Sequence, residues 1–109
     1  MKTLYLDEGD NISLELHHRI AQKLQKDPFL ISVAKNNISR WLSVDRSRSY
    51  KIAIQEWSEK INSLSLDDLI HEMLREDDEG QRLRSNSPFG GILSESERLE
   101  VLELVHAAT

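Results

Sequence analysis

The stretch "SYKIAIQEWSEKI", residues 49–61, indicates the fold class of this chain. Its Tyr, Ala, Ile, Trp and Ile residues recur at positions 50, 53, 54, 57 and 61, a spacing that lines one face of an α-helix. A half-buried strand would alternate apolar and polar residues instead. We therefore expect a helix that buries the face carrying Tyr50 and Trp57 against the rest of the protein.

Similar stripes flank this segment on both sides. A first helix is predicted to begin after Asp10 or Asn11, because apolar residues then recur every four positions as far as Leu24. A second is predicted to open at Asp27 and Pro28 and run to Leu42. Its stripe contains one polar residue, Asn37, which is expected to face outward if the stripe drifts around the helix.

The second half of the chain continues the helical pattern. Ser65, with an acid three residues later, predicts the start of a fourth helix. A short polar helix is expected around Leu83, and Ser94 with Glu97 forms a capping box for the last helix. The prediction is an all-α fold, a compact bundle of five to six short helices. Residues 11–109 would form one domain, and residues 1–10 a tail or a short edge strand.

The composition restricts the classes of function. The chain has 109 residues, 39% of them hydrophobic, and a formal net charge of -5. It contains no cysteine, which excludes disulfides, thiolate catalysis and zinc sites built on cysteine. We find neither a signal peptide nor an apolar run of the roughly 18 residues that span a bilayer. We therefore predict a cytoplasmic protein with no membrane contact.

No pattern of residues predicts an active site. His17 and His18 are neighbours, so on a helix they point about 100° apart and are poorly placed to share a metal. His71 begins no H-E-x-x-H motif, because position 75 is Arg75, and no serine lies in G-x-S-x-G. We expect histidines at the surface or half-buried. The prediction is a protein that is not an enzyme, without catalytic, cofactor-binding or metal-ligating residues.

The loop "SPFGG", residues 87–91, interrupts the helical pattern. Pro88 disfavours helix at the residue before it, and Gly90 and Gly91 both permit a tight reversal with positive φ. Two interpretations of Phe89 stay open: it anchors the turn in the core, or it is presented to a partner on a loop held by a rigid scaffold.

The run "RLRSNSPFGGILSESER", residues 82–98, resembles the C-terminal signature of a family of small bacterial all-helical proteins. In that family a pattern R-L-R-x-x-S-P-F-x-G-x-L-x-x-x-E-R follows a helical segment with a Trp, and some members are encoded beside toxin-like or nucleotidyltransferase-like genes. The resemblance implies an antitoxin-like role, binding another protein, and carries no catalytic residues. The predicted partner-binding residues are Arg82, Arg84, Phe89, Gly90, Gly91, Glu97 and Arg98. A homodimer that buries surplus apolar positions is a second expectation.

The alternative function is DNA binding by a transcriptional regulator. Residues 35–51 carry five bases and one acid, whereas residues 67–79 carry seven acids and one base. Arg and Asn side chains read base edges in the major groove. The candidate nucleic-acid residues are Lys35, Asn36, Arg40, Arg46, Arg48 and Lys51. The negative net charge and a long turn without Gly count against this alternative.

Overall fold

The computed structural model describes residues 8–44 and 47–108, and every regular element in these ranges is a helix. In chain order they are α1 (Glu8–Lys26), the 3-10 turn η2 (Pro28–Leu30), α2 (Ile31–Leu42), α3 (Arg48–Ser63), α4 (Leu66–Met73), α5 (Asp78–Ser85) and α6 (Glu95–Ala108). The prediction of an all-α bundle with five to six helices is confirmed.

The first helix begins earlier than predicted. Residues 8–10, assigned to the tail, belong to α1. Asp10 is therefore part of the helix and is not the residue that precedes it. The predicted edge strand around Leu4 and Leu6 lies outside the described residues.

Side-chain caps explain where several helices begin. The hydroxyl of Ser65 accepts a hydrogen bond from the backbone N–H of Asp68 at 3.1 Å, as predicted. At α6, the backbone N–H of Glu97 donates to the Ser94 hydroxyl, and the Glu97 carboxylate accepts from the Ser94 N–H. This reciprocal pair confirms the predicted capping box. Side chains also cap other elements at Asp27, Ser47 and Asp77.

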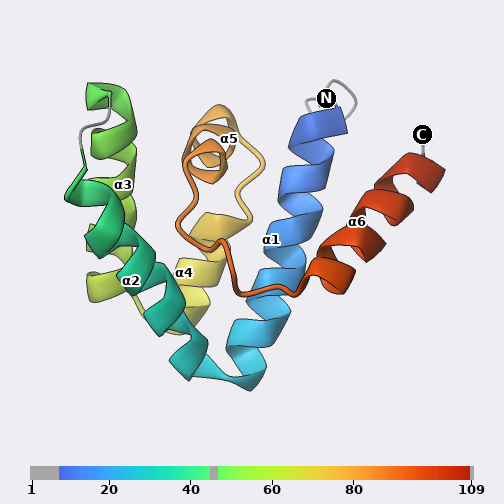
Figure 1. Ribbon diagram of the computed structural model, residues 1–109, viewed down its shortest axis with the longest axis horizontal. Coiled ribbons are helices and arrows are strands. Elements are labelled where there is room, and N and C mark those ends of the chain that lie inside the picture. Colours follow the sequence, from blue (N-terminus) through green and yellow to red (C-terminus); the bar gives the residue numbers. More distant parts are fainter. Residues whose placement is uncertain (1–7, 45–46, 109) are drawn as a thin grey trace.

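The helix α1 stands in the middle of the bundle (Figure 1). It contacts η2, α4 and α5, and α6 lies against it from the opposite side. On the far side of α4 and α5, α2 packs against α3, and α3 also meets α5. The loop between α5 and α6 crosses the bundle from the α2–α3 side to α1, which places it at the junction of the two halves.

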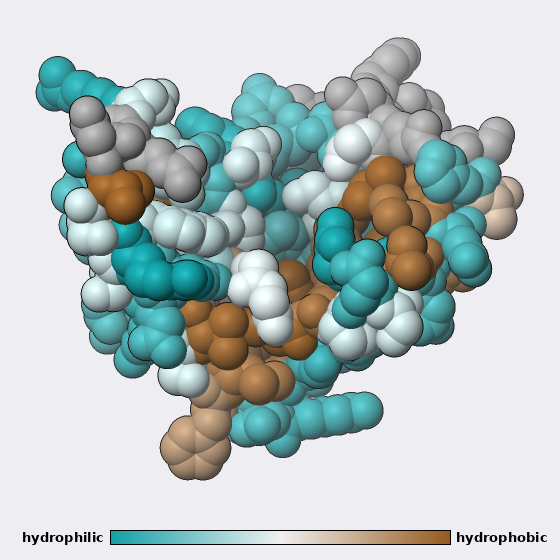
Figure 2. Space-filling model, viewed as in Figure 1, coloured by the Kyte–Doolittle hydropathy of each residue, from teal (hydrophilic) through white to brown (hydrophobic). Residues whose placement is uncertain are grey.

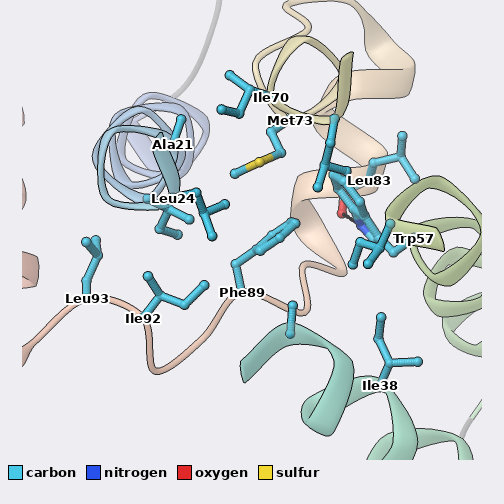
Figure 3. Packing of buried hydrophobic residues seen from close by; sticks show 14 of the residues in the cluster. Ala21, Leu24, Ile38, Trp57, Ile70, Met73, Leu83, Phe89, Ile92 and Leu93 are labelled. Atoms are coloured by element: carbon cyan, nitrogen blue, oxygen red, sulfur yellow. Dashed lines mark hydrogen bonds between the residues drawn. The ribbon is translucent and has the colours of Figure 1, made fainter. Parts of the chain in front are cut away.

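The core is centred on two aromatic rings that lie far apart in the sequence (Figure 3). Trp57 from α3 and Phe89 from the loop before α6 are 0% and 1% exposed. Their ring centroids are 5.2 Å apart in an edge-to-face arrangement. The Trp57 indole N–H donates to the carbonyl of Leu83 at 2.8 Å, so its polar atom is satisfied inside the core. Leu24 of α1 and Met73 of α4 close the same cluster.

Candidate interaction site

The loop at residues 87–91 is anchored in the core. Phe89 points inward toward Trp57. The ring of His17 is perpendicular to that of Phe89, with the two centroids 6.0 Å apart. The interpretation of Phe89 as a core anchor is therefore the one that the structure supports, and the exposed alternative is wrong. Of the two glycines only Gly91 has a positive φ, at 96°, so the reversal requires one glycine.

Asn37 fixes the backbone of this loop from α2. It is 5% exposed, and its side-chain amide donates to the carbonyls of Pro88 and Gly90, each at 2.9 Å. The expectation that Asn37 faces outward is wrong, because two loop carbonyls about fifty residues away require a buried donor. Its carbonyl oxygen accepts from the Arg40 guanidinium, which completes the hydrogen bonding of the amide.

His17 fixes the loop from α1. It is 5% exposed, so the expectation of surface or half-buried histidines is wrong for His17, whereas His18, His71 and His106 are exposed as expected. Its Nδ1–H donates to the carbonyl of Ser13 at 2.7 Å, and its Nε2 accepts from the hydroxyl of Ser87 at 2.7 Å. Burial is the main cause that lowers the His17 pKa from 6.5 to about 4. The imidazole is therefore neutral near pH 7.

Arg84, a predicted partner contact, is buried. It is 5% exposed and donates to the carbonyls of Met73 and Arg75 at the end of α4. These carbonyls lie at the C-terminal end of α4 and have no hydrogen-bond partner within that helix. A cation there also interacts favourably with the negative end of the α4 dipole. The side chain of Arg84 therefore joins α5 to α4 and is not available to a partner.

The first turn of α5 packs closely against the residues after α4 at Gly80. A Cβ added at Gly80 would lie 2.1 Å from the carbonyl oxygen of Arg75, a distance that no side chain allows. The Arg75 carbonyl thus accepts from Arg84 on one side and is approached by the Gly80 backbone on the other.

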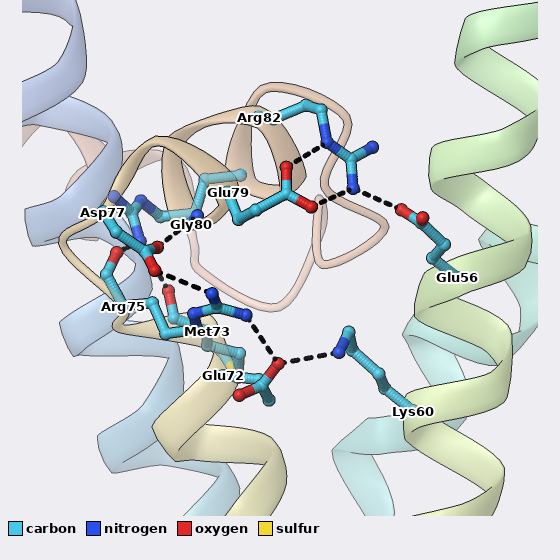
Figure 4. Close-up of polar contacts among 10 residues, drawn as sticks. Glu56, Lys60, Glu72, Met73, Arg75, Asp77, Glu79, Gly80 and Arg82 are labelled. Carbon is cyan, nitrogen blue, oxygen red and sulfur yellow. Dashed lines mark hydrogen bonds and ion pairs between the residues drawn. The ribbon is translucent and has the colours of Figure 1, made fainter.

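Arg82 belongs to a network of ion pairs (Figure 4). Its guanidinium bonds Glu79 at 2.7 Å and Glu56 of α3 at 2.6 Å. Arg75 and Lys60 both pair with Glu72 in the same region, and hydrogen bonds from these two bases, that from Lys60 foremost, lower the Glu72 pKa. These groups are partly exposed, so each pair adds little stability. Arg82 is accessible but engaged with these carboxylates.

Glu97 and Arg98 differ in their surroundings. The Glu97 carboxylate accepts hydrogen bonds from the Lys23 ammonium at 2.9 Å and from the backbone N–H of Ser94. These two hydrogen bonds, that from Lys23 foremost, lower the Glu97 pKa to about 2. Lys23 also donates to the carbonyl of Ile92, so α1, the loop and α6 meet here. Arg98 is exposed and pairs with Glu95 at 3.2 Å on its own helix.

A small pocket lies beside the anchored loop. It has a volume of about 180 Å³ and is bordered by Leu16, His17, Ile20, Ser87, Phe89, Gly90, Gly91, Leu93 and Arg98. Apolar side chains gather at the lower centre of the molecule, where the loop crosses between α1 and α2 (Figure 2). Phe89, Gly90, Gly91 and Arg98 come from the predicted partner-binding set, whereas Arg82, Arg84 and Glu97 do not border the pocket. The sequence patterns do not predict that Leu16, His17 and Ile20 of α1 border this pocket.

Four of the six candidate nucleic-acid residues are exposed. Lys35, Asn36 and Arg40 are exposed on α2, and Arg48 is exposed at the start of α3. Lys51 is half-buried, and Arg46 lies outside the described residues. Within residues 8–44 and 47–108, no cluster of three or more His, Cys, Asp or Glu side chains is placed to hold a metal ion.

The described helices lack the combination of length and apolar character that a membrane span requires. Comparison with known proteins returned no matching family model, no matching curated protein and no matching solved structure.

Proposed function

We propose that this protein is a non-enzymatic protein-interaction module whose pocket at residues 87–91 receives an apolar side chain of a partner. The observation that carries the proposal is the pocket itself. Its wall is formed by Leu16, Ile20, Phe89 and Leu93, and Arg98 supplies a cation at the border. An apolar cavity with a few polar groups at its edge is typical of sites that bind by hydrophobic contact.

The rigid setting of the loop supports this role. Phe89 in the core, the two hydrogen bonds from Asn37 and the Ser87–His17 hydrogen bond hold the loop in one conformation. A partner therefore meets a preformed surface and loses little free energy to ordering the loop.

The Ser87–His17 pair has the composition of a nucleophile and a base, but its chemistry argues for a structural role. A histidine with a pKa of about 4 is a weak base near pH 7. The Ser87 oxygen also accepts from the backbone N–H of Phe89, which is the geometry of a loop turn. We expect no turnover at this pair.

The identity of the partner follows from the resemblance of residues 82–98 to the small bacterial family. We propose an antitoxin-like role in which the partner is a toxin-like or nucleotidyltransferase-like protein encoded next to this chain. A cytoplasmic setting fits a protein without cysteine.

The test is co-expression with the product of the neighbouring reading frame and capture on this chain. Gly90→Asp is the informative variant, because a Cβ at Gly90 has no neighbour within 4 Å and Gly90 has no positive φ. We expect the variant to keep the fold and to add a carboxylate at the pocket mouth, so capture should fall at least about tenfold. Gln55→Glu on the exposed side of α3 adds the same charge and should capture as wild type. Equal capture by both variants would refute the proposal.

DNA binding is the second candidate, because Lys35, Asn36, Arg40 and Arg48 are all exposed. It predicts salt-sensitive binding to duplex DNA that is lost when Arg46 and Arg48 are both replaced by Ala. A flat titration of the wild-type protein with random and upstream DNA would remove this candidate.

A further inference from the structure

Phe29 is unusual among the large apolar side chains of the described residues. It is 87% exposed, whereas the other exposed ones, Val44, Ile52, Leu99 and Leu104, are 43–52% exposed. The backbone that carries the ring is held in place. Asp27 accepts from the Phe29 N–H at 3.2 Å, Pro28 fixes the first position of η2, and η2 contacts both α1 and α2. The fold thus presents an aromatic ring on a short, fixed turn.

The pocket at residues 87–91 has the size and lining for such a ring. An apolar cavity of about 150 Å³ is sufficient to bind benzene. The pocket here is about 180 Å³ and is bordered by Leu16, Ile20, Phe89 and Leu93. A phenyl ring placed there would pack against this apolar lining.

The turn that carries Phe29 and the loop that borders the pocket lie near each other, but Phe29 does not border the pocket of its own chain. A methyl group added at Gly91 would lie 3.6 Å from Val33, four residues after Phe29, so the loop borders the beginning of α2. The turn that carries Phe29 and the loop both lie in the lower half of the view in Figure 1. In a dimer with two-fold symmetry the same contact is made twice. The Phe29 ring of each chain would then enter the pocket of the other chain.

We infer that, in the absence of that partner, a second copy of the chain occupies this pocket, with Phe29 of each copy inserted into the pocket of the other. The inference rests on the proposed function of the pocket. Charge supports the pairing: Asp27 lies two residues before Phe29, and Arg98 is the cation at the pocket border. Asp27 uses one carboxylate oxygen for the cap, and its other oxygen has no hydrogen bond within the described residues. Insertion of Phe29 brings it toward Arg98 of the second copy.

The expected dimer is weak. Two buried rings contribute at most about 500 Å², well below the roughly 1,600 Å² of a typical stable interface, so the surrounding surface must supply the remainder. A dissociation constant in the micromolar range is the natural expectation, and such a dimer can give way to a tighter partner at the same pocket.

The experiment is sedimentation of the full chain over a concentration series from 1 to 500 µM. Wild type should shift from monomer to dimer, and Phe29→Ala should weaken the dimer about 100-fold or more. Leu104→Ala, which removes another exposed apolar side chain from α6, should sediment as wild type. Asp27→Arg and Arg98→Asp should each weaken the dimer, and the double variant should recover it. A dimer that persists in Phe29→Ala, or a wild type that is monomeric at 500 µM, would overturn the inference.

A probe that does not depend on self-association separates this inference from the proposed function. The probe is N-acetylphenylalanine amide, added to the Phe29→Ala variant and followed by the methyl NMR signals of Leu16, Ile20 and Leu93. Saturable shifts in Phe29→Ala, together with a wild type that stays monomeric at 500 µM, would uphold the pocket and reject the second copy. A Phe29-dependent dimer with these shifts supports both. Absence of both dimer and shifts would reject the self-association and the proposed pocket together.

Discussion

The chain contains two prolines and two phenylalanines, and in both cases they form the dipeptide Pro-Phe. Phe29 is 87% exposed and Phe89 is 1% exposed. At residues 28–29, Asp27 caps a helical turn whose second residue points away from the bundle. At residues 88–89, the same dipeptide follows the end of α5, and Trp57, His17 and Asn37 close around it. The comparison shows that the surroundings, and not the dipeptide, determine which ring becomes core.

The largest expected effect comes from truncating each ring. Phe89→Ala should lower the free energy of unfolding by about 3–5 kcal/mol, since it leaves a cavity against Trp57. Phe29→Ala should change it by less than about 0.5 kcal/mol. Guanidinium unfolding at low micromolar concentration measures both without a contribution from association. Equal losses would contradict the assignment of one ring to the core and the other to the surface. Because Phe89→Ala threatens the fold, it cannot serve as a binding test.

Acid should destabilise the fold through His17, whose ring lies beside Phe89. His17 has a pKa of about 4 in the folded chain and 6.5 unfolded, so the unfolded state binds the proton more tightly. The free energy of unfolding should therefore fall as the pH drops from about 6.5 to about 4, by up to about 3 kcal/mol in total. His17→Gln should flatten this part of the stability profile, measured by urea unfolding. His18→Gln, a change at the exposed neighbour, should keep the slope.

Asn37 tests how the loop is held. Asn37→Ala removes the donors to the carbonyls of Pro88 and Gly90 and should cost about 1–3 kcal/mol. Asn36→Ala, one residue earlier and exposed, should be close to neutral. Thermal unfolding distinguishes the two variants. A neutral Asn37→Ala would mean that Phe89 alone keeps the loop in place.

The smallest expected difference lies between the two glycines. Gly91→Ala should cost about 1–2 kcal/mol because its φ of 96° disfavours any other residue. Gly90→Ala should be nearly neutral, since a methyl group there meets nothing within 4 Å. Chemical unfolding of both variants gives the comparison, and a costly Gly90→Ala would show that its backbone also depends on glycine.

Local sequence signals predicted most of the fold. The apolar stripes located the helices, and the caps at Ser65 and Ser94 were predicted from residues three positions apart. Such signals are sufficient because helix hydrogen bonds and caps join near neighbours. The first helix was predicted to begin a few residues too late, an error typical of helix ends.

The site was harder to predict because its polar residues are satisfied by distant partners. Asn37 bonds carbonyls 51 and 53 residues away, and His17 bonds a hydroxyl 70 residues away. The sequence pattern predicts an outward-facing Asn37 and an ordinary surface or half-buried His17, because no local pattern indicates a buried hydrogen bond to a distant residue. Pro88, Gly90 and Gly91 are sufficient to predict a loop at residues 88–91. The pocket beside it depends on how α1 packs against the loop and α6, which no local pattern encodes.

The carbonyl of Arg75 limits how this chain can be lengthened. Arg84 donates to it, and the backbone of Gly80 lies too close for a side chain. An inserted or deleted residue at positions 76–83 would change the distance between these two contacts, and the displacement would reach Phe89 through the turn after α5. Circular permutation, fusion points and purification tags are therefore better placed elsewhere in the sequence.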